Sequence, residues 1–235
     1  MRVAVLMPAL NEGPTLTTTL GRIAAQANPD LAITVYLVDD GSQPAITVAS
    51  PQKDCFRVVA ARHRINLGQG AAIETARQLS LKTAGYDAYV TMDSDGQHDP
   101  ADLPRFAGAL QAGADVVFGS RFLGIDSRTM PAGRRLLLQA ARRFERMLTG
   151  LALTDAHNGY RAFSERAIRS IVLRQDRMAH ATEIKLRVAG QKDLVVREIP
   201  IEVQYTDESL KKGQSSLGAF AILRDLMHDY LFGGR

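Results

Sequence analysis

Short apolar runs alternate with amphipathic stretches along the first half of the chain. Apolar, β-rich runs predict strands at residues 2–8, 32–38, 57–61, 87–92 and 114–118. Helices are predicted between them, from Pro14 to about Gln26, after Gly70 to about Thr83, and near residues 101–112. Strands that alternate with helices of this length are typical of βαβ units. We therefore expect an α/β fold with a mostly parallel central sheet flanked by helices.

Polar residues follow the predicted carboxyl ends of four of these strands. The clusters are Asn11-Glu12, Asp39-Asp40, Asn66, and the pair Asp93 and Asp95. The carboxyl ends of strands in an open α/β sheet converge on one edge, so these segments should meet there although they are far apart in sequence. The pattern predicts a ligand site at that edge.

The second half of the chain is less regular. Apolar positions at helical spacing predict a helix over residues 134–151, with arginines on its other face. We further expect strands at 158–164 and 194–205, helices at 165–173, 180–189 and 216–231, and a loop at 206–216. With 235 residues, no internal repeat and no linker, the chain is predicted to form a single domain.

Composition narrows the class of protein. The contents of 46% hydrophobic and 23% charged residues are ordinary for a globular protein. The single cysteine, Cys55, excludes an intramolecular disulfide and suits a reducing cytoplasm. No apolar run approaches the roughly 18 residues of a membrane span, and the first residues predict a strand rather than a signal peptide. We therefore expect a cytoplasmic protein.

Positive charge is concentrated between Arg121 and Arg146. Seven arginines in this segment, against Asp126 and Glu145, give it a charge of +5, while the whole chain carries +4. A local basic patch indicates an anionic partner. One interpretation is a solvated helix face; the other is a basic amphipathic helix that rests on anionic lipid. Nucleic-acid binding is not expected, because the chain has no tryptophan and no recognised nucleic-acid module.

The segment Asp93-Ser94-Asp95-Gly96-Gln97 carries the sharpest chemical signal. Alternate residues after a strand can point the same way, which brings together the carboxylates of Asp93 and Asp95 and the amide oxygen of Gln97. Two crowded carboxylates repel unless a cation lies between them, and oxygen ligands suit Mg²⁺ or Mn²⁺. A turn rich in aspartate and glycine is the alternative. For the neighbouring His98, a loop or capping role is favoured over contact with a metal.

Eight motifs occur in an order that resembles the family-2 glycosyltransferases. They are VAVLMPALNE, VDDGS, NLGQGAA, MDSDGQHDP, GSR, DAHNGYR, EIPI and KKGQSS, and they cover about residues 2–216. The most similar branch comprises the dolichol- or polyprenyl-phosphate mannose and glucose synthases, with related bacterial polysaccharide enzymes beside it. The resemblance implies a GT-A fold and an enzyme that uses a nucleotide-diphosphate sugar, UDP- or GDP-linked.

The resemblance also implies where the donor binds. Residues 1–120 would form the nucleotide-sugar-binding half, and residues 121–235 the acceptor-binding half. The positions that match the family's donor and metal sites are Pro8, Ala9, Asn11, Glu12, Val38, Asp40, Gly68, Asp93, Ser94, Asp95 and Gln97. Asp40 is the expected base or ribose ligand, whereas Asp39 is equally compatible with capping a turn. Gly68 and Gly70 permit close backbone approach where a phosphate can bind, and a plain strand-to-helix turn fits them equally well.

Catalytic positions are implied as well. Arg121 and Arg134 match arginines that contact phosphate, which a planar guanidinium binds with two hydrogen bonds. Asp155 would act as a general base towards a sugar hydroxyl. With an anionic acceptor no strong base is needed, and Asp155 would instead position Arg161 or the acceptor.

Two further positions are implied to bind the donor. Glu183 aligns with a family glutamate, although Ala179 stands where some relatives carry a lysine. Lys212 lies in a glycine-containing loop that would close over the diphosphate as a lid. A solvated run of charge is the alternative for Lys212.

We therefore predict an inverting sugar transfer to polyprenyl phosphate in cell-envelope glycan synthesis, with Mg²⁺ or Mn²⁺ bound. The chain ends at Arg235 without the carboxyl-terminal membrane helices of many relatives, so we expect peripheral contact with the inner face of the membrane through residues 121–146. Transfer to a glycan hydroxyl is the alternative. A sugar nucleotidyltransferase is disfavoured because residues 9–13 lack a glycine-rich basic loop, and a non-catalytic nucleotide-sugar binding module because the acidic pair is intact.

Overall fold

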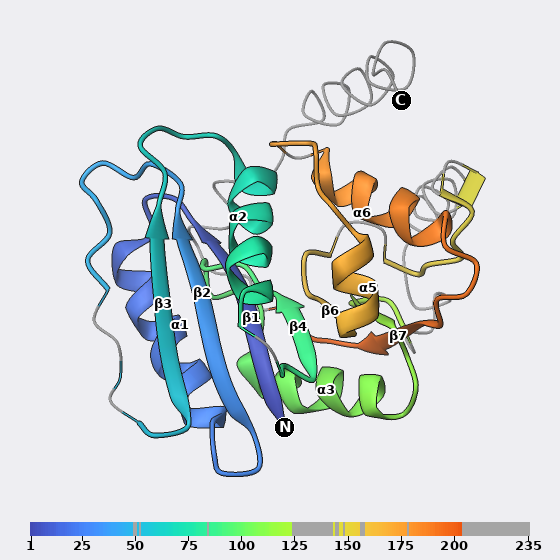
Figure 1. Cartoon of the computed structure of the whole chain (residues 1–235), viewed down its shortest axis with the longest axis horizontal. Helices are drawn as coiled ribbons and strands as arrows, with labels where there is room; N and C mark the ends of the chain where they lie inside the picture. The colour runs from blue at the N-terminus through green and yellow to red at the C-terminus, as the bar shows by residue number, and fades with distance from the viewer. Residues whose placement is uncertain are drawn as a thin grey trace, which may run out of the picture.

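The computed structural model describes residues 1–48, 51, 53–83, 85–123, 143, 146–147, 149–155, 158–177 and 179–203 (Figure 1). Its strands are β1 (Arg2–Ala9), β2 (Ala32–Asp39), β3 (Phe56–Arg62), β4 (Ala88–Thr91), β5 (Val116–Ser120), β6 (Arg161–Phe163) and β7 (Val196–Pro200). Its helices are α1 (Gly13–Gln26), α2 (Gln69–Leu81), α3 (Leu103–Gln111), α5 (Glu165–Ser170) and α6 (His180–Ala189), with a 3-10 turn η1 (Pro100–Asp102) before α3.

The described strands form one sheet in the order β3-β2-β1-β4-β6-β5-β7. The strands β3, β2, β1 and β4 run parallel to one another, and β5 runs parallel to β7. The short strand β6 lies between β4 and β5 and is antiparallel to both. The prediction of a mostly parallel α/β sheet is therefore confirmed.

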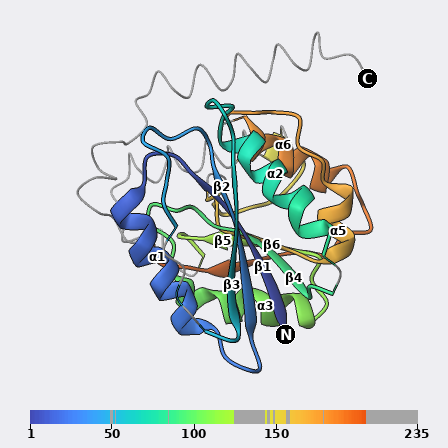
Figure 2. The same cartoon turned by 60° about the vertical axis from the view of Figure 1, so that its left-hand side comes forward.

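Helices cover both faces of the sheet (Figure 2). Along β1, Val5 belongs to the same core cluster as Leu20 of α1 and Phe106 of α3, while the next residue, Leu6, belongs to the second cluster, with Ala76 of α2. Residues 3–7 of β1 are 0% exposed. A strand buried on both faces must be apolar at every position, which explains the continuous apolar run in the sequence. This rigid central strand fixes the loop that follows it.

Every strand and helix predicted within the described residues is present, with boundaries that shift by a few residues. The helix predicted at 165–173 ends at Ser170, because Ile171 has an extended backbone with ψ of 95°. The strand predicted at 194–205 ends at Pro200, opposite Ser120 at the end of its partner β5. The helix predicted at 216–231, the loop at 206–216 and most of the helix at 134–151 lie outside the described residues. None of the helices in the described part is long and apolar enough to cross a membrane.

Candidate active site

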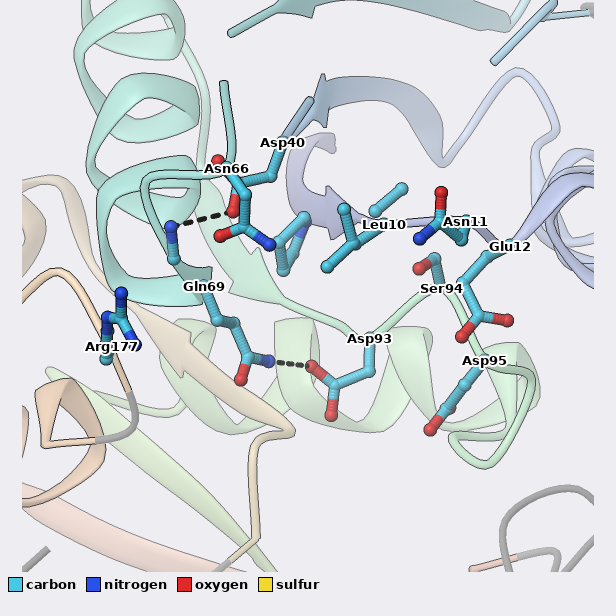
Figure 3. Close-up of a pocket in the computed structure, with 13 residues that line it drawn as sticks. Leu10, Asn11, Glu12, Asp40, Asn66, Gln69, Asp93, Ser94, Asp95 and Arg177 are labelled. Carbon is cyan, nitrogen blue, oxygen red and sulfur yellow. Dashed lines mark hydrogen bonds between the residues drawn. The ribbon is translucent and has the colours of Figure 1, made fainter. Parts of the chain in front are cut away.

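A pocket of about 810 Å³ lies at the carboxyl ends of β1, β2 and β4 (Figure 3). The strands β1 and β2 stay in register up to the pair Ala9 and Asp39, and Leu6 of β1 lies beside Thr91 at the end of β4. The loops after these strands therefore open at the same edge. The pocket is lined by Pro8, Ala9, Leu10, Asn11, Glu12, Asp40, Asn66, Gly68, Gln69, Asp93, Ser94, Asp95 and Arg177. The four polar clusters of the sequence thus meet at one place.

Asn11 connects the loops after β1 and β2. Its φ of 57° lies in the left-handed region, which asparagine tolerates better than most residues. Its backbone N–H donates to Ser42 Oγ at 2.9 Å, and its side-chain oxygen accepts the N–H of Gln43 at 3.1 Å. These two bonds fix the turn that carries Glu12 to the rim of the pocket.

The adjacent aspartates after β2 have different roles. Asp39 accepts the N–H groups of Ser42 at 2.8 Å and Ile46 at 3.1 Å, and it pairs with Arg62 Nε at 3.1 Å. Burial acts to raise the pKa of Asp39, but these hydrogen bonds and the Arg62 charge outweigh burial and leave the pKa below its usual value. Asp39 thus caps the turn, as the alternative interpretation held, and it does not line the pocket.

Asp40 lines the pocket and at the same time fixes the loop before α2. Its carboxylate accepts the N–H groups of Leu67 at 3.0 Å and Gly68 at 2.8 Å, and Oδ1 lies 2.7 Å from His63 Nδ1. Because its side chain is 4% exposed, these contacts occupy most of its surface. Asp40 can meet a ligand only at the edge that faces the cavity.

Asp93 is held from two sides. Gln69 Nε2 donates to Asp93 Oδ1 at 2.8 Å, the bond drawn in Figure 3. His98 accepts the backbone N–H of Asp93 at Nδ1 (3.2 Å), and its Nε2 lies 3.9 Å from Asp93 Oδ2. His98 is stacked on Tyr160 at 4.8 Å between ring centroids, and burial lowers its pKa, so the ring is neutral and Nε2 carries the proton. His98 therefore caps the backbone N–H of Asp93 and lies beside its carboxylate.

Asp95 completes an acidic pair. Burial raises the pKa of Asp95; the N–H of Gln97, at 3.0 Å from Oδ1, opposes that rise, and the negative charge of Asp93 adds to it. A divalent cation beside both carboxylates would stabilise their ionised forms and so oppose the rise in pKa. Oxygen-only donors suit Mg²⁺ or Mn²⁺. No group of three or more His, Cys, Asp or Glu side chains could hold a metal among the described residues. The pair therefore fits a cation whose remaining ligands come from a diphosphate or water.

Arg121 and Asp155 form a two-pronged ion pair outside the pocket lining. Arg121 Nε lies 2.7 Å from Asp155 Oδ2, and its terminal nitrogen lies 3.0 Å from Oδ1. The backbone N–H of Arg121 donates to Oδ2 as well, at 3.1 Å, and the Asp155 side chain is 1% exposed. A buried carboxylate with both oxygens engaged by a guanidinium is poorly placed to remove a proton. The geometry therefore favours a positioning role for Asp155 over the role of general base, and the residue that it orients is Arg121, where the sequence predicted Arg161 or the acceptor.

The remaining predicted residues do not line the pocket. Val38 is fully buried in β2, and Gln97 contacts Asp95 through its backbone N–H. Arg161 is 2% exposed in β6. The carboxylate of Glu183 accepts the backbone N–H groups of Arg174 and Gln175 in the segment before α6. Arg134 and Lys212 lie outside the described residues.

Three lining residues were not predicted from the sequence: Leu10, Gln69 and Arg177. Leu10 lies in the motif VAVLMPALNE and Gln69 in the motif NLGQGAA, so their neighbours gave a signal. Arg177 lies in the irregular segment between α5 and α6 and belongs to no motif. Nothing in the sequence alone could have placed it at a pocket formed by the first half of the chain.

Comparisons with known proteins show the family. Residues 4–172 match the sequence model of glycosyl transferase family 2. Polyprenol monophosphomannose synthase of Mycolicibacterium smegmatis is 34% identical over 176 residues, covering 73% of this chain and 65% of that protein. Undecaprenyl-phosphate mannosyltransferase of Micrococcus luteus is also 34% identical over 176 residues, covering 74% of this chain and 70% of that protein.

A solved structure shares the fold. Glucosyl-3-phosphoglycerate synthase from Mycobacterium tuberculosis, in complex with Mn²⁺ and uridine-diphosphate-glucose, superposes with a TM-score of 0.60. The alignment covers 98% of this chain and 78% of that structure at 20% sequence identity. The GT-A fold predicted from the motifs is therefore confirmed.

Proposed function

Because this chain belongs to glycosyl transferase family 2, we propose that it transfers a sugar from a nucleotide-diphosphate sugar to a polyprenyl phosphate. An acceptor phosphate oxygen attacks the anomeric carbon of the sugar from the face opposite the leaving group. The bond between that carbon and the diphosphate oxygen breaks, the nucleoside diphosphate departs, and the configuration at the carbon inverts. Residues 1–120 form the nucleotide-sugar-binding half and residues 121–235 the acceptor-binding half.

The observation that carries this proposal is the meeting of Asp40, Asp93 and Asp95 in one pocket. Asp93 and Asp95 are the residues that would hold Mg²⁺ or Mn²⁺, which supplies charge neutralisation for a leaving diphosphate. Asp40 and the turn at Asn11 and Glu12 line the other side, where hydrogen-bond acceptors suit a base or a ribose. Gln69 and His98 hold Asp93 in place for this task.

Two observations support a polyprenyl phosphate as the acceptor. The relatives in Mycolicibacterium and Micrococcus are named for transfer of mannose to polyprenol or undecaprenyl phosphate. Independently, the pairing of Asp155 with Arg121 leaves that carboxylate unsuited to act as a base. A phosphate acceptor is already an anion and needs no strong base, whereas a glycan hydroxyl does. The geometry therefore supports a phosphate acceptor over a hydroxyl.

Cationic groups from the second half would assist the leaving group. Arg121, Arg134 and Lys212 are proposed to approach the phosphates, and Arg121 is pre-oriented by Asp155. The arginine-rich segment 121–146 is proposed to rest on anionic lipid at the inner face of the membrane, where a polyprenyl phosphate presents its headgroup.

A transfer assay tests the proposal. Purified protein is incubated with UDP-, GDP- or dTDP-sugars and Mn²⁺, with undecaprenyl phosphate or an oligosaccharide as acceptor, and the lipid and glycan products are separated by mass. We expect lipid-linked sugar, with turnover lost in Asp93→Asn and in Asp95→Asn. Asp54→Asn is the matched control, because Asp54 is exposed and lies outside the donor pocket.

Two results would overturn parts of this account. Sugar found only on the oligosaccharide would replace the proposed acceptor and restore the need for a base. Asp93→Asn with the turnover of the Asp54→Asn control would remove the metal site from the mechanism.

A further inference from the structure

We propose that Arg177 is a phosphate-binding residue that the second half of the chain contributes to the donor pocket. The inference rests on the proposed function, because it assumes that the ligand is a phosphate ester. The inference starts from the uneven balance of charge in the pocket lining. The pocket is lined by four carboxylates, those of Glu12, Asp40, Asp93 and Asp95, and among its described lining residues Arg177 alone is basic.

An anionic ligand needs positive charge in such a pocket. A cation on the acidic pair would neutralise the charges of Asp93 and Asp95. The carboxylate of Asp40 already accepts two hydrogen bonds from the loop before α2. Figure 3 places Arg177 across the pocket from Glu12 and beside Gln69. An arginine there presents up to five N–H donors in a planar fork that matches phosphate oxygens.

The backbone that carries Arg177 is held firmly. Glu183, 9% exposed in α6, accepts the N–H groups of Arg174 and Gln175, each at 2.9 Å from Oε2. The N–H of Ala71 in α2 donates to the carbonyl of Asp176 at 3.2 Å. Residues 174–177 are therefore anchored to helices of both halves. Glu183, implied by the resemblance to bind the donor, acts here through the segment that delivers Arg177.

Two glycines make room for this segment. A Cβ atom on Gly70 would overlap the carbonyl oxygen of Gln175 and come within 2.8 Å of His180 Cβ. On Gly68, whose φ is +110°, a Cβ would overlap the carbonyl oxygen of Asp176 and lie 3.0 Å from Arg177 Cγ. The pair Gly68 and Gly70 therefore serves as a seat for residues 174–177. This close packing places the stem of Arg177 against the loop, at the edge of the cavity that Arg177 lines.

Arg174 provides an internal comparison. It lies three residues earlier on the same segment and is exposed like Arg177, but it does not line the pocket. If the net charge of this surface governs phosphate binding, substitution of either arginine should weaken it. An effect caused by contact with phosphate would belong to Arg177 alone.

The phosphate can come from two sources, the diphosphate of the donor or the phosphate of the acceptor, and the assay separates them. Dissociation constants of UDP and GDP with Mn²⁺ are measured by calorimetry, and KM for the donor and for undecaprenyl phosphate in the transfer assay. The proteins compared are wild type, Arg177→Ala, Arg177→Lys and Arg174→Ala. We expect Arg177→Ala to weaken phosphate binding by about tenfold or more, Arg177→Lys to recover part of the loss, and Arg174→Ala to match wild type.

Each outcome decides the question. A weaker dissociation constant for the nucleoside diphosphate assigns Arg177 to the donor, and a higher KM for undecaprenyl phosphate alone assigns it to the acceptor. Unchanged values in Arg177→Ala, or equal changes in Arg174→Ala, overturn the inference. Wild-type protein that binds nucleoside diphosphate but transfers no sugar contradicts the proposed function instead, and Arg177 is then judged by the binding constants.

A second variant tests the seat. Gly70→Ala should displace residues 174–177 and weaken phosphate binding about as much as Arg177→Ala does, with little further loss when the two are combined. Gly21→Ala in α1 is the matched control, because a Cβ there meets no atom within 4 Å. Additive losses in the double variant would show that the glycine and Arg177 act separately and would contradict the proposed seating.

Discussion

Acid should destabilise the protein through His180, at the start of α6. The His180 side chain is buried, and Nδ1 lies 2.7 Å from the carbonyl oxygen of Arg177, to which it donates. Burial lowers the pKa of His180 from 6.5 to about 4; the positive charge of Arg161 adds to the decrease, and the bond to the Arg177 carbonyl opposes it. The folded protein therefore holds a neutral imidazole at a pH where an exposed imidazole is already protonated.

The sign follows from proton binding. Between pH 6.5 and about 4 the unfolded chain binds a proton at His180 and the folded protein does not. The free energy of unfolding therefore falls by about 1.4 kcal/mol for each pH unit as the pH is lowered through this window. Above pH 6.5 His180 does not lower the free energy of unfolding. At pH 4.5 the proton that His180 binds in the unfolded chain makes this free energy about 2 kcal/mol lower than at pH 7.

Urea denaturation of wild type and His180→Gln at pH 7 and pH 4.5 measures how much His180 contributes to the free energy of unfolding. The transition is followed by far-UV circular dichroism, since the chain has no tryptophan. Glutamine keeps an N–H donor but does not titrate, and all other groups titrate alike in both proteins. We expect wild type to lose about 2 kcal/mol more than His180→Gln between the two pH values. Equal losses in the two proteins would refute the argument, because His180 would then be free to bind its proton in the folded state.

Three further predictions follow from packing and hydrogen bonding. Gly159→Ala places a Cβ 2.9 Å from Asp93 Oδ2, so the affinity for Mn²⁺ with UDP should fall about tenfold or more by calorimetry; Gly108→Ala, where a Cβ meets nothing within 4 Å, should match wild type. Phe106→Ala removes a fully buried ring and should cost about 3–5 kcal/mol in urea denaturation, and a cost below about 1 kcal/mol would contradict the packing described. Asp39→Asn weakens the acceptor of two backbone N–H groups and should cost about 1–3 kcal/mol at pH 7; an unchanged urea midpoint would argue against the turn cap.

Much of the fold was predictable because the central strands are buried on both faces. Burial makes β1 apolar at nearly every position, and its parallel neighbours must then end at the same edge. For that reason the sequence alone placed Asp40, Asp93 and Asp95 together, and the structure brings them to one pocket. The alternation of apolar and polar residues also located the flanking helices.

The parts that sequence reasoning missed depend on tertiary packing. The strand predicted at 158–164 is present as Arg161–Phe163, but its place between β4 and β5, antiparallel to both, follows from tertiary packing and not from its sequence. Arg177 reaches the pocket only because Gly68 and Gly70 let a distant segment approach α2. The carboxylate of Glu183 binds backbone N–H groups, a contact that leaves no trace in the pattern of side chains.

The central claim is that Asp93 and Asp95 hold a divalent cation that binds the diphosphate of the donor. Calorimetric titration of UDP or GDP, with and without Mn²⁺, tests it on wild type, Asp93→Asn and Asp95→Asn. We predict that Mn²⁺ strengthens nucleoside diphosphate binding to wild type by at least about tenfold, and that each substitution removes most of this gain. Asparagine variants that keep the full Mn²⁺-dependent gain would contradict the account, because the cation would then be held elsewhere.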